Sequence, residues 1–204
     1  MRIVKASFEI VERLPRKRAI WLICLAGGTC YQSGAEERDA EAQSAFVRRI
    51  VERAHHSVLE HITVTVRLIV DRGVMAELTR HRVGVSFSIE STRYCNYSDK
   101  DKFGGELTFV DHPSRDNGQY HAWKRFMQAS ESAYLDALMY GASPQEARSV
   151  LPNSLKTVII MTANIREWMH IFSLRCAPAA HPDMRHIMCQ VRDDFQAWLP
   201  EVFE

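Results

Sequence analysis

The hydrophobic pattern is clearest in residues 62–68, where apolar and polar side chains alternate one by one. The apolar positions are Ile62, Val64, Val66 and Leu68, and the positions between them are Thr63, Thr65 and Arg67. Because successive side chains of a strand point to opposite faces, this period of two predicts a β-strand with one buried face. Residues 3–12 predict another strand, with a turn after it at Pro15 and the basic residues 16–18.

Helical spacing dominates the rest of the chain. Apolar residues recur three and four positions apart from residue 36 to about 53, at Ala42, Ala45, Phe46 and Ile50, with Arg49 in the same spacing. This period predicts a helix. The apolar residues 19–28 predict a shorter helix that ends at Gly27 and Gly28. Residues 120–140 predict a long amphipathic helix that Gly141 stops.

Further elements follow from residues that begin and end helices. Asn164 can cap a helix over residues 164–175, and a last helix is expected from about Pro182 to Leu199. Ser143 stands three residues before Glu146, with Pro144 between them, which is typical of a helix start. Residues 155–162, LKTVIIMT, fit a buried strand or a continued helix equally well.

Shorter segments complete the pattern. After Asp71 the period becomes helical through residues 74–82, and the chain then runs into an extended or irregular segment. The charged residues 98–105 predict a turn that leads to a short strand, and residues 111–118 predict a polar loop.

The composition indicates one folded domain. The chain has 204 residues, of which 46% are hydrophobic and 25% charged, enough for one sizeable core. Internal repeats and low-complexity segments are absent from the sequence. We therefore expect a helix-rich α+β fold over residues 1–204 as a single domain, with a small central antiparallel or mixed sheet.

Charge and cysteine content exclude some classes of protein. Twenty-six Lys and Arg against 25 Asp and Glu give a net charge of +1, which argues against a protein that coats nucleic acid. The five cysteines form no C-x-x-C pair, so neither a zinc knuckle nor a disulfide framework is indicated. The N-terminal residues lack the apolar core of a signal peptide, and charges interrupt every long apolar run. We expect a soluble, cytoplasmic protein without a membrane partner.

Arg80, His81 and Arg82 form the first candidate site, followed by Ser91, Thr92, Arg93 and Tyr94. Cations at the end of a helix are favourable by themselves, so a helix C-terminus explains the cluster without any ligand. Arginines joined by hydroxyl groups also suit a phosphorylated small molecule, because each guanidinium can donate two parallel hydrogen bonds to phosphate. A nucleic-acid contact would need more basic stripes than a neutral chain offers.

Two further stretches carry candidate residues. HHSVLEH, residues 55–61, lacks the H-E-x-x-H spacing of a helical zinc site, so no metal is expected, whereas Ser57 and Glu60 could bond to a ligand's edge. In NIREWMHIFSLR, Arg166 and His170 lie four residues apart on one helix face. Asn164 and Arg175 mark the ends of this helix, which could hold another anion or be an ordinary surface helix.

Together these stretches resemble the flavin-dependent thymidylate synthases. The signature of that family begins Arg-His-Arg and reaches Ser-x-Arg-Tyr after a short spacer, and the corresponding residues here are Arg80, His81, Arg82, Ser91, Arg93 and Tyr94. GTCYQS, HHSVLEH, VDRGVMAELTRHR, EARSVLP, NIREW and LRCAPAAHPDMR stand in the family's order. The resemblance covers most of the chain and implies the family's fold.

The resemblance also implies roles for individual residues. The implied flavin contacts, for FAD, are Ser57, Glu60, Arg80, His81, Arg82, Glu90, Asn164, Arg166 and His170. The implied contacts to deoxyuridylate (dUMP) are Glu77, Arg80, Glu90, Ser91, Thr92, Arg93, Arg148 and Arg175. Within these sets Arg175 is the implied catalytic residue beside the uracil ring, and His170 stands where the family often has asparagine.

The implied reaction is the reductive methylation of dUMP to dTMP, with methylenetetrahydrofolate as carbon donor and NADPH as reductant, in a homotetramer with shared active sites. Two features depart from the family. The spacer between Arg82 and Ser91 is one residue longer than usual, and Ile89 stands where Glu or Gln is common. A bulge could swing Glu90 into that place. The alternatives are a related hydroxymethylation of dUMP, or a non-catalytic module that binds nucleotides or nucleic acid.

Overall fold

The structure, a computed structural model, describes residues 1–111 and 115–204. Its described part forms two compact units. Unit 1 comprises residues 1–8, 67–80 and 87–160, and unit 2 comprises residues 9–66, 81–86 and 161–204. The single-domain expectation stays a prediction, and each unit is described by itself below.

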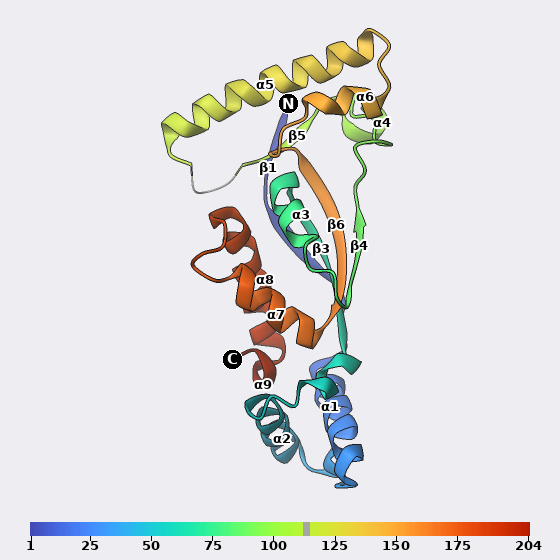
Figure 1. The fold of residues 1–204 in the computed structure, drawn as a ribbon, viewed down its shortest axis with the longest axis vertical. Coiled ribbons are helices and arrows are strands. Elements are labelled where there is room, and N and C mark those ends of the chain that lie inside the picture. The colour runs from blue at the N-terminus through green and yellow to red at the C-terminus, as the bar shows by residue number, and fades with distance from the viewer. Residues whose placement is uncertain (112–114) are drawn as a thin grey trace. The chain divides into compact units, whose positions relative to one another are not determined.

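The described residues form helices and strands in mixed order along the chain (Figure 1). The strands are β1 Arg2–Lys5, β2 Ser7–Glu12, β3 Thr63–Asp71, β4 Val85–Ile89, β5 Thr108–Asp111 and β6 Lys156–Asn164. The α-helices are α1 Arg16–Tyr31, α2 Ala40–Glu52, α3 Arg72–Leu78, α4 Lys100–Phe103, α5 Asn117–Met139, α6 Pro144–Ala147, α7 Ile165–Arg175, α8 Pro182–Trp198 and α9 Pro200–Phe203. The 3-10 helices are η1 Ala35–Glu37, η2 His56–His61 and η3 Arg148–Val150.

The strands form two small sheets. β1 pairs in parallel with β5, with Ile3 opposite Phe109, and the other sheet has the order β2-β3-β6-β4. The α+β class predicted from the pattern is confirmed. The predicted strand over residues 3–12 is divided at Ala6, because its two halves pair in different sheets. The ambiguous segment 155–162 is a strand, β6, whose side chains alternate between buried and half-buried.

Unit 1 is built around the inner face of α5, which Figure 1 shows running past β1 and β5. Met127 and Tyr134 of α5 pack in one hydrophobic cluster with Phe109 of β5 and with Tyr97 and Leu155. The predicted helix over 120–140 is confirmed with an earlier start, because Asp116 and Gln119 form a capping box that begins the helix at Asn117. Of the predicted loop at 111–118, residues 112–114 lie outside the described residues.

The aromatic side chains of α7, α8 and α9 form the core of unit 2. The Trp168 ring of α7 lies tilted against Phe195 of α8, and Phe172 of α7 and Phe203 of α9 each meet Phe195 edge-on. The buried Trp168 indole donates to the backbone oxygen of Val64 at 3.2 Å. This hydrogen bond fastens α7 to β3. Trp168 lies between the candidate residues Arg166 and His170 on the same helix.

Two predictions about α1 are wrong. Residues 16–18 are its first turn rather than a turn of the chain, with Pro15 at the N-cap, and Gly27 and Gly28 lie inside the helix. A Cβ atom on Gly27 would come within 2.9 Å of the Phe46 ring. The glycine therefore serves close packing of α1 on α2 rather than helix termination, which occurs at the left-handed Gln32.

Most of the other boundary signals act as predicted. Asn164 caps α7, accepting from the backbone N–H of Glu167 at 2.9 Å, and Ser143 with Glu146 forms the capping box of α6. Gly141, with φ of +94°, follows the end of α5. Among the described helices, none combines the length and the apolar character that crossing a bilayer requires.

Candidate functional site

A cavity of about 730 Å³ in unit 2 gathers candidate residues from separate parts of the chain. Four of the residues predicted as flavin contacts line it: Glu60, Asn164, Arg166 and His170. The remaining lining residues are His56, Val83, Gly84, Glu167, Met169 and Ser173. The walls are therefore formed by η2, by Val83 and Gly84 directly before β4, and by α7 with its N-cap Asn164.

Backbone hydrogen bonding explains why η2 and α7 meet here. The N–H of Ile165, at the start of α7, donates to the carbonyl of Ile62, directly after η2, at 2.9 Å. Thr65 and Thr162 join the adjoining strands through their hydroxyl groups at 2.9 Å. Since both segments are tied at their ends, the side chains of Glu60 and Arg166 are held close enough to meet.

Gly84 brings the chain past this cavity. Its φ of +68° lies in the left-handed region, where residues with a Cβ atom are strained. A Cβ atom there would lie 3.8 Å from the Asn164 amide nitrogen, so the backbone runs close over the start of α7. The sequence pattern did not single out Gly84, although a glycine after Arg-His-Arg is a signal for such a turn.

Arg166 forms an ion pair with Glu60 across the cavity wall. The two side chains keep 53% and 44% of their surface exposed, respectively. Ion pairs as exposed as this typically contribute about 0–1 kcal/mol. Arg166 can therefore turn its guanidinium to an anionic ligand at little cost in stability.

His81 connects a carboxylate with an arginine in the interior of unit 2. Arg175 Nε donates to His81 Nε2 at 2.9 Å, and His81 Nδ1 lies 3.5 Å from Glu167 Oε1. An accepting Nε2 requires the ring proton on Nδ1, which faces the carboxylate. The ring also meets His170 edge-on, with centroids 5.8 Å apart. Both nitrogens of His81 are thus directed at protein groups.

The surroundings of His81 keep its ring neutral. Burial, followed by the charge of Arg175 and the neighbouring His170, lowers the pKa of His81 to about 4. Burial raises the pKa of Glu167, against the opposing effect of His170 and Arg166. A neutral imidazole can accept from Arg175 at pH 7, whereas an imidazolium cannot. The environment therefore preserves the bond that orients Arg175.

Within the described part of the chain, His81, Glu167 and His170 form a group that could hold a metal ion, because their ligand atoms lie within 4.8 Å of one another. Two histidines and a carboxylate suit several divalent metals. The guanidinium of Arg175, bonded to Nε2, places a positive charge beside that position. A neutral His81 that accepts from Arg175, with Glu167 close to its other nitrogen, is the better interpretation of these contacts.

Ser57 and Arg82, also predicted as flavin contacts, are exposed in unit 2. Ser57 belongs to η2, and Arg82 follows the buried His81 directly. Neither is among the described residues that line the cavity. Their predicted roles remain proposals.

The residues predicted to bind dUMP, apart from Arg175, lie in unit 1. Glu77 is on α3 and Arg80 follows it, while Ser91, Thr92 and Arg93 form a turn after β4. Arg93 Nε donates to Gln145 Oε1 of α6 at 3.1 Å, which ties this turn to the helix that continues into η3 and the exposed Arg148. Two cations and the Ser91 hydroxyl are thereby held on neighbouring segments. Gln145, which supplies the tie, was missed because exposed glutamines are common.

Glu90 already has protein partners in unit 1. Its carboxylate accepts from the Tyr97 hydroxyl at 2.8 Å and from Lys156 Nζ at 2.6 Å. β4 alternates half-buried and exposed residues regularly from Val85 to Ile89, and Glu90 follows the end of the strand. Burial, followed by the charge of Glu90, raises the pKa of Tyr97. The prediction that Glu90 turns to the nucleotide therefore requires it to leave Tyr97 and Lys156, and it stays a prediction.

Comparison with known proteins decides the family. Residues 10–201 match the model of the family described as "Thymidylate synthase complementing protein". A flavin-dependent thymidylate synthase of Pyrococcus furiosus is 33% identical over 195 residues, covering 94% of this chain and 78% of the relative. One from Geobacter sulfurreducens is 30% identical over 187 residues, covering 89% and 79%. The chain belongs to the flavin-dependent thymidylate synthase family.

The family fold is confirmed as well. A crystal structure of the UMP/dUMP methylase PolB from Streptomyces cacaoi, bound with 5-Br dUMP, superimposes with a TM-score of 0.82 at 20% sequence identity. The match covers 100% of this chain and 95% of that one. As a member of this family, the chain is an enzyme.

Proposed function

We propose that this chain methylates dUMP reductively to dTMP, with FAD as cofactor, methylenetetrahydrofolate as carbon donor and NADPH as reductant. The observation that carries the proposal is the unit 2 cavity, in which four residues predicted as flavin contacts come together from η2 and α7. Names of relatives support a flavin and thymidylate synthesis. FAD, NADPH and methylenetetrahydrofolate are proposed from the family resemblance.

The cavity fits a flavin nucleotide in size and in chemistry. Its volume of about 730 Å³ lies within the range of 300–1,000 Å³ typical of ligand pockets. Arg166 can bond a phosphate, and the Asn164 amide and Ser173 hydroxyl can donate and accept hydrogen bonds. When bound, FAD would supply hydride transfer and one-carbon chemistry that side chains cannot. The exposed Arg82 is proposed to hold its diphosphate.

The chain's own contribution would be positioning and charge. Ser91, Arg93 and Arg148 are proposed to bind the phosphate of dUMP. Arg175 is proposed to stabilise negative charge on the uracil ring as its N3 loses a proton, because a guanidinium stays charged and donates in a fixed plane. His81 would hold that plane in place through the bond to Nε. These roles assign the chemistry to arginines rather than to a cysteine nucleophile.

Assembly is part of the same proposal. The family resemblance implies a homotetramer whose active sites are shared between chains, and we propose this assembly here. We also propose a cytoplasmic location.

Replacing Arg82 or Arg166 with alanine is expected to weaken FAD binding about tenfold or more, because one charge-assisted hydrogen bond contributes about 1.5–3 kcal/mol. The protein is titrated with FAD, and binding is followed by the flavin's absorbance and fluorescence. Arg125→Ala, which removes an exposed cation of α5, is the control. Unchanged FAD affinity in both the Arg82 and the Arg166 variant, or the same loss in the control, would count against the proposed flavin site.

A further inference from the structure

A separate cavity of about 470 Å³ lies within unit 1. It is lined by parts of β1, β3 and β6, by α4, and by residues that flank them. The described residues that line it include none of those predicted to bind flavin or dUMP. Whatever this cavity holds is therefore additional to the two predicted ligand sites.

The lining of this cavity is strongly basic. It contains Arg2, Lys5, Arg67, Lys102 and Lys156, against the single carboxylate of Glu106. That carboxylate accepts from the amino group of Met1 at 2.7 Å. A chain with a net charge of only +1 thus concentrates five cationic side chains around one cavity.

The cations of this cavity differ in whether they have a partner within the protein, and Arg67 is among those that have one. Lys156 bonds Glu90 at 2.6 Å, whereas Arg2, Lys5 and Lys102 form no ion pair within residues 1–111 and 115–204. Arg2, Arg67 and Lys156 all line this one cavity, and like charges placed so repel each other less when an anion lies between them. The charge distribution therefore favours a ligand with more than one negative group.

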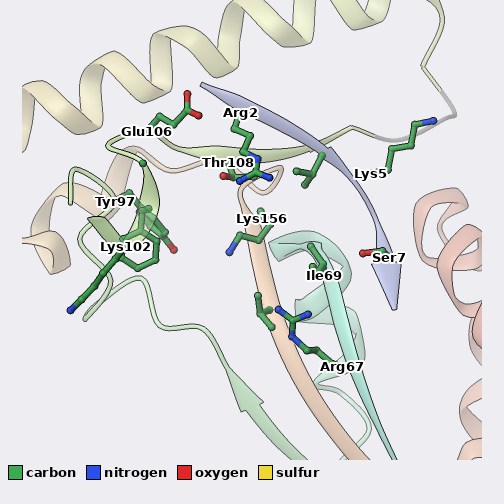
Figure 2. A pocket seen from close by; sticks show the side chains of 14 residues that line it. Arg2, Lys5, Ser7, Arg67, Ile69, Tyr97, Lys102, Glu106, Thr108 and Lys156 are labelled. Atoms are coloured by element: carbon green, nitrogen blue, oxygen red, sulfur yellow. The ribbon is translucent and has the colours of Figure 1, made fainter. Parts of the chain in front are cut away.

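Figure 2 shows how the side chains are arranged. Arg2 from β1, Arg67 from β3 and Lys156 from β6 point their nitrogens into the space between these strands, while Lys5 and Lys102 point away from it. Ile69 and Val158 form an apolar part of the wall, and Tyr97 adds an aromatic ring. The cavity thus combines cations that can bond phosphate or carboxylate with a surface for an apolar body.

We propose that the unit 1 cavity binds a small organic anion that carries at least two phosphate or carboxylate groups. Arg2, Arg67 and Lys156 bond the anionic groups, and Ile69 with Tyr97 contacts the apolar part of the molecule. The cavity volume lies in the range typical of small-ligand pockets, and the neutral chain disfavours a nucleic acid. The proposal does not depend on FAD or dUMP binding. Two classes of ligand carry such groups: nucleoside polyphosphates, and chains of glutamate residues with their carboxylates.

Isothermal titration calorimetry on the full chain tests the proposal, with ATP and tri-γ-glutamate as separate probes. The titrations are run alone and again in the presence of saturating FAD and dUMP, so that binding at the other predicted sites is separated. We expect at least one probe to bind in both conditions. If ATP binds more tightly, the ligand is assigned as a polyphosphate. If tri-γ-glutamate binds more tightly, it is assigned as a polycarboxylate.

The variants Arg2→Gln and Arg67→Gln are each expected to raise the Kd of the bound probe about tenfold. Arg2 is exposed, so its replacement leaves folding intact even if Arg67→Gln lowers stability. Arg125→Gln on α5, with the same loss of net charge, is expected to stay within about twofold of the wild type. A Kd for Arg2→Gln within about twofold of the wild type, an equal loss in Arg125→Gln, or no binding of either probe would overturn the proposal.

Discussion

Replacing Arg175 with alanine is expected to lower the rate of dTMP formation by about 10²–10³-fold while FAD stays bound. A preorganised donor at developing negative charge typically contributes this much to catalysis. Arg175 is held by its Nε–H bond to the neutral His81, at 2.9 Å, so its plane is set before substrate binds. Arg175→Lys is expected to recover little, because an ammonium lacks the planar, multiply donating group. Product formation at saturating substrates and flavin absorbance of the same samples measure the two quantities.

Cys176, the neighbour of Arg175, provides the matched control. Burial, together with a hydrogen bond to Cys189, raises the pKa of Cys176 to about 12, so its thiolate is scarce at pH 7. Cys176→Ala is therefore expected to retain activity close to the wild type. An inactive Cys176→Ala beside an active Arg175→Ala would mean that the uracil ring is activated covalently and that the proposed mechanism is wrong.

The next largest expected effect is on the pH dependence of the free energy of unfolding. The folded-state pKa of His81 is about 4, below its ordinary value of 6.5. Between these values the unfolded chain takes up a proton that the folded chain does not, so the free energy of unfolding falls as the pH falls. The full contribution is present above pH 6.5, and about 3 kcal/mol is lost by pH 4.

His81→Gln removes this titration but keeps an acceptor for Arg175 and a donor for Glu167. Urea unfolding from pH 7 to pH 4 should therefore show a loss of stability about 3 kcal/mol smaller in the variant than in the wild type. His186→Gln, which removes an exposed imidazole, controls for the loss of a histidine as such. Parallel pH profiles for the wild type and His81→Gln would show that His81 is not held neutral.

The spacing of apolar residues predicted those helices and strands that bury the face their own sequence makes apolar. β3, α5 and the helices that carry Asn164 and Pro182 appear where alternation and capping residues place them. Predictions from neighbouring residues failed where contacts with distant parts of the chain determine where an element ends. Gly27 continues α1 because Phe46 of α2 packs against it, and the segment 3–12 divides because its halves find different sheet partners. Neither contact can be read from the neighbouring residues alone.

The candidate site was predictable in its motif residues but not in their partners. Glu60 and Arg166 were singled out from separate stretches, and the fold brings them into contact. Glu167 was missed as the neighbour of His81, although its place three residues after Asn164 is typical of a helix start. The unit 1 cavity was missed because its cations come singly from different strands and form no motif in the sequence.

Product analysis tests the central claim of reductive methylation most directly. The purified chain is mixed with FAD, dUMP, methylenetetrahydrofolate and NADPH, and the nucleotides are separated and identified by mass spectrometry. Mixtures that lack one component serve as controls. We predict dTMP as the product, formed with equimolar NADPH oxidation and only in the complete mixture. A hydroxymethylated nucleotide as the product, dTMP formation that does not require FAD, or no turnover of dUMP would contradict the proposed function.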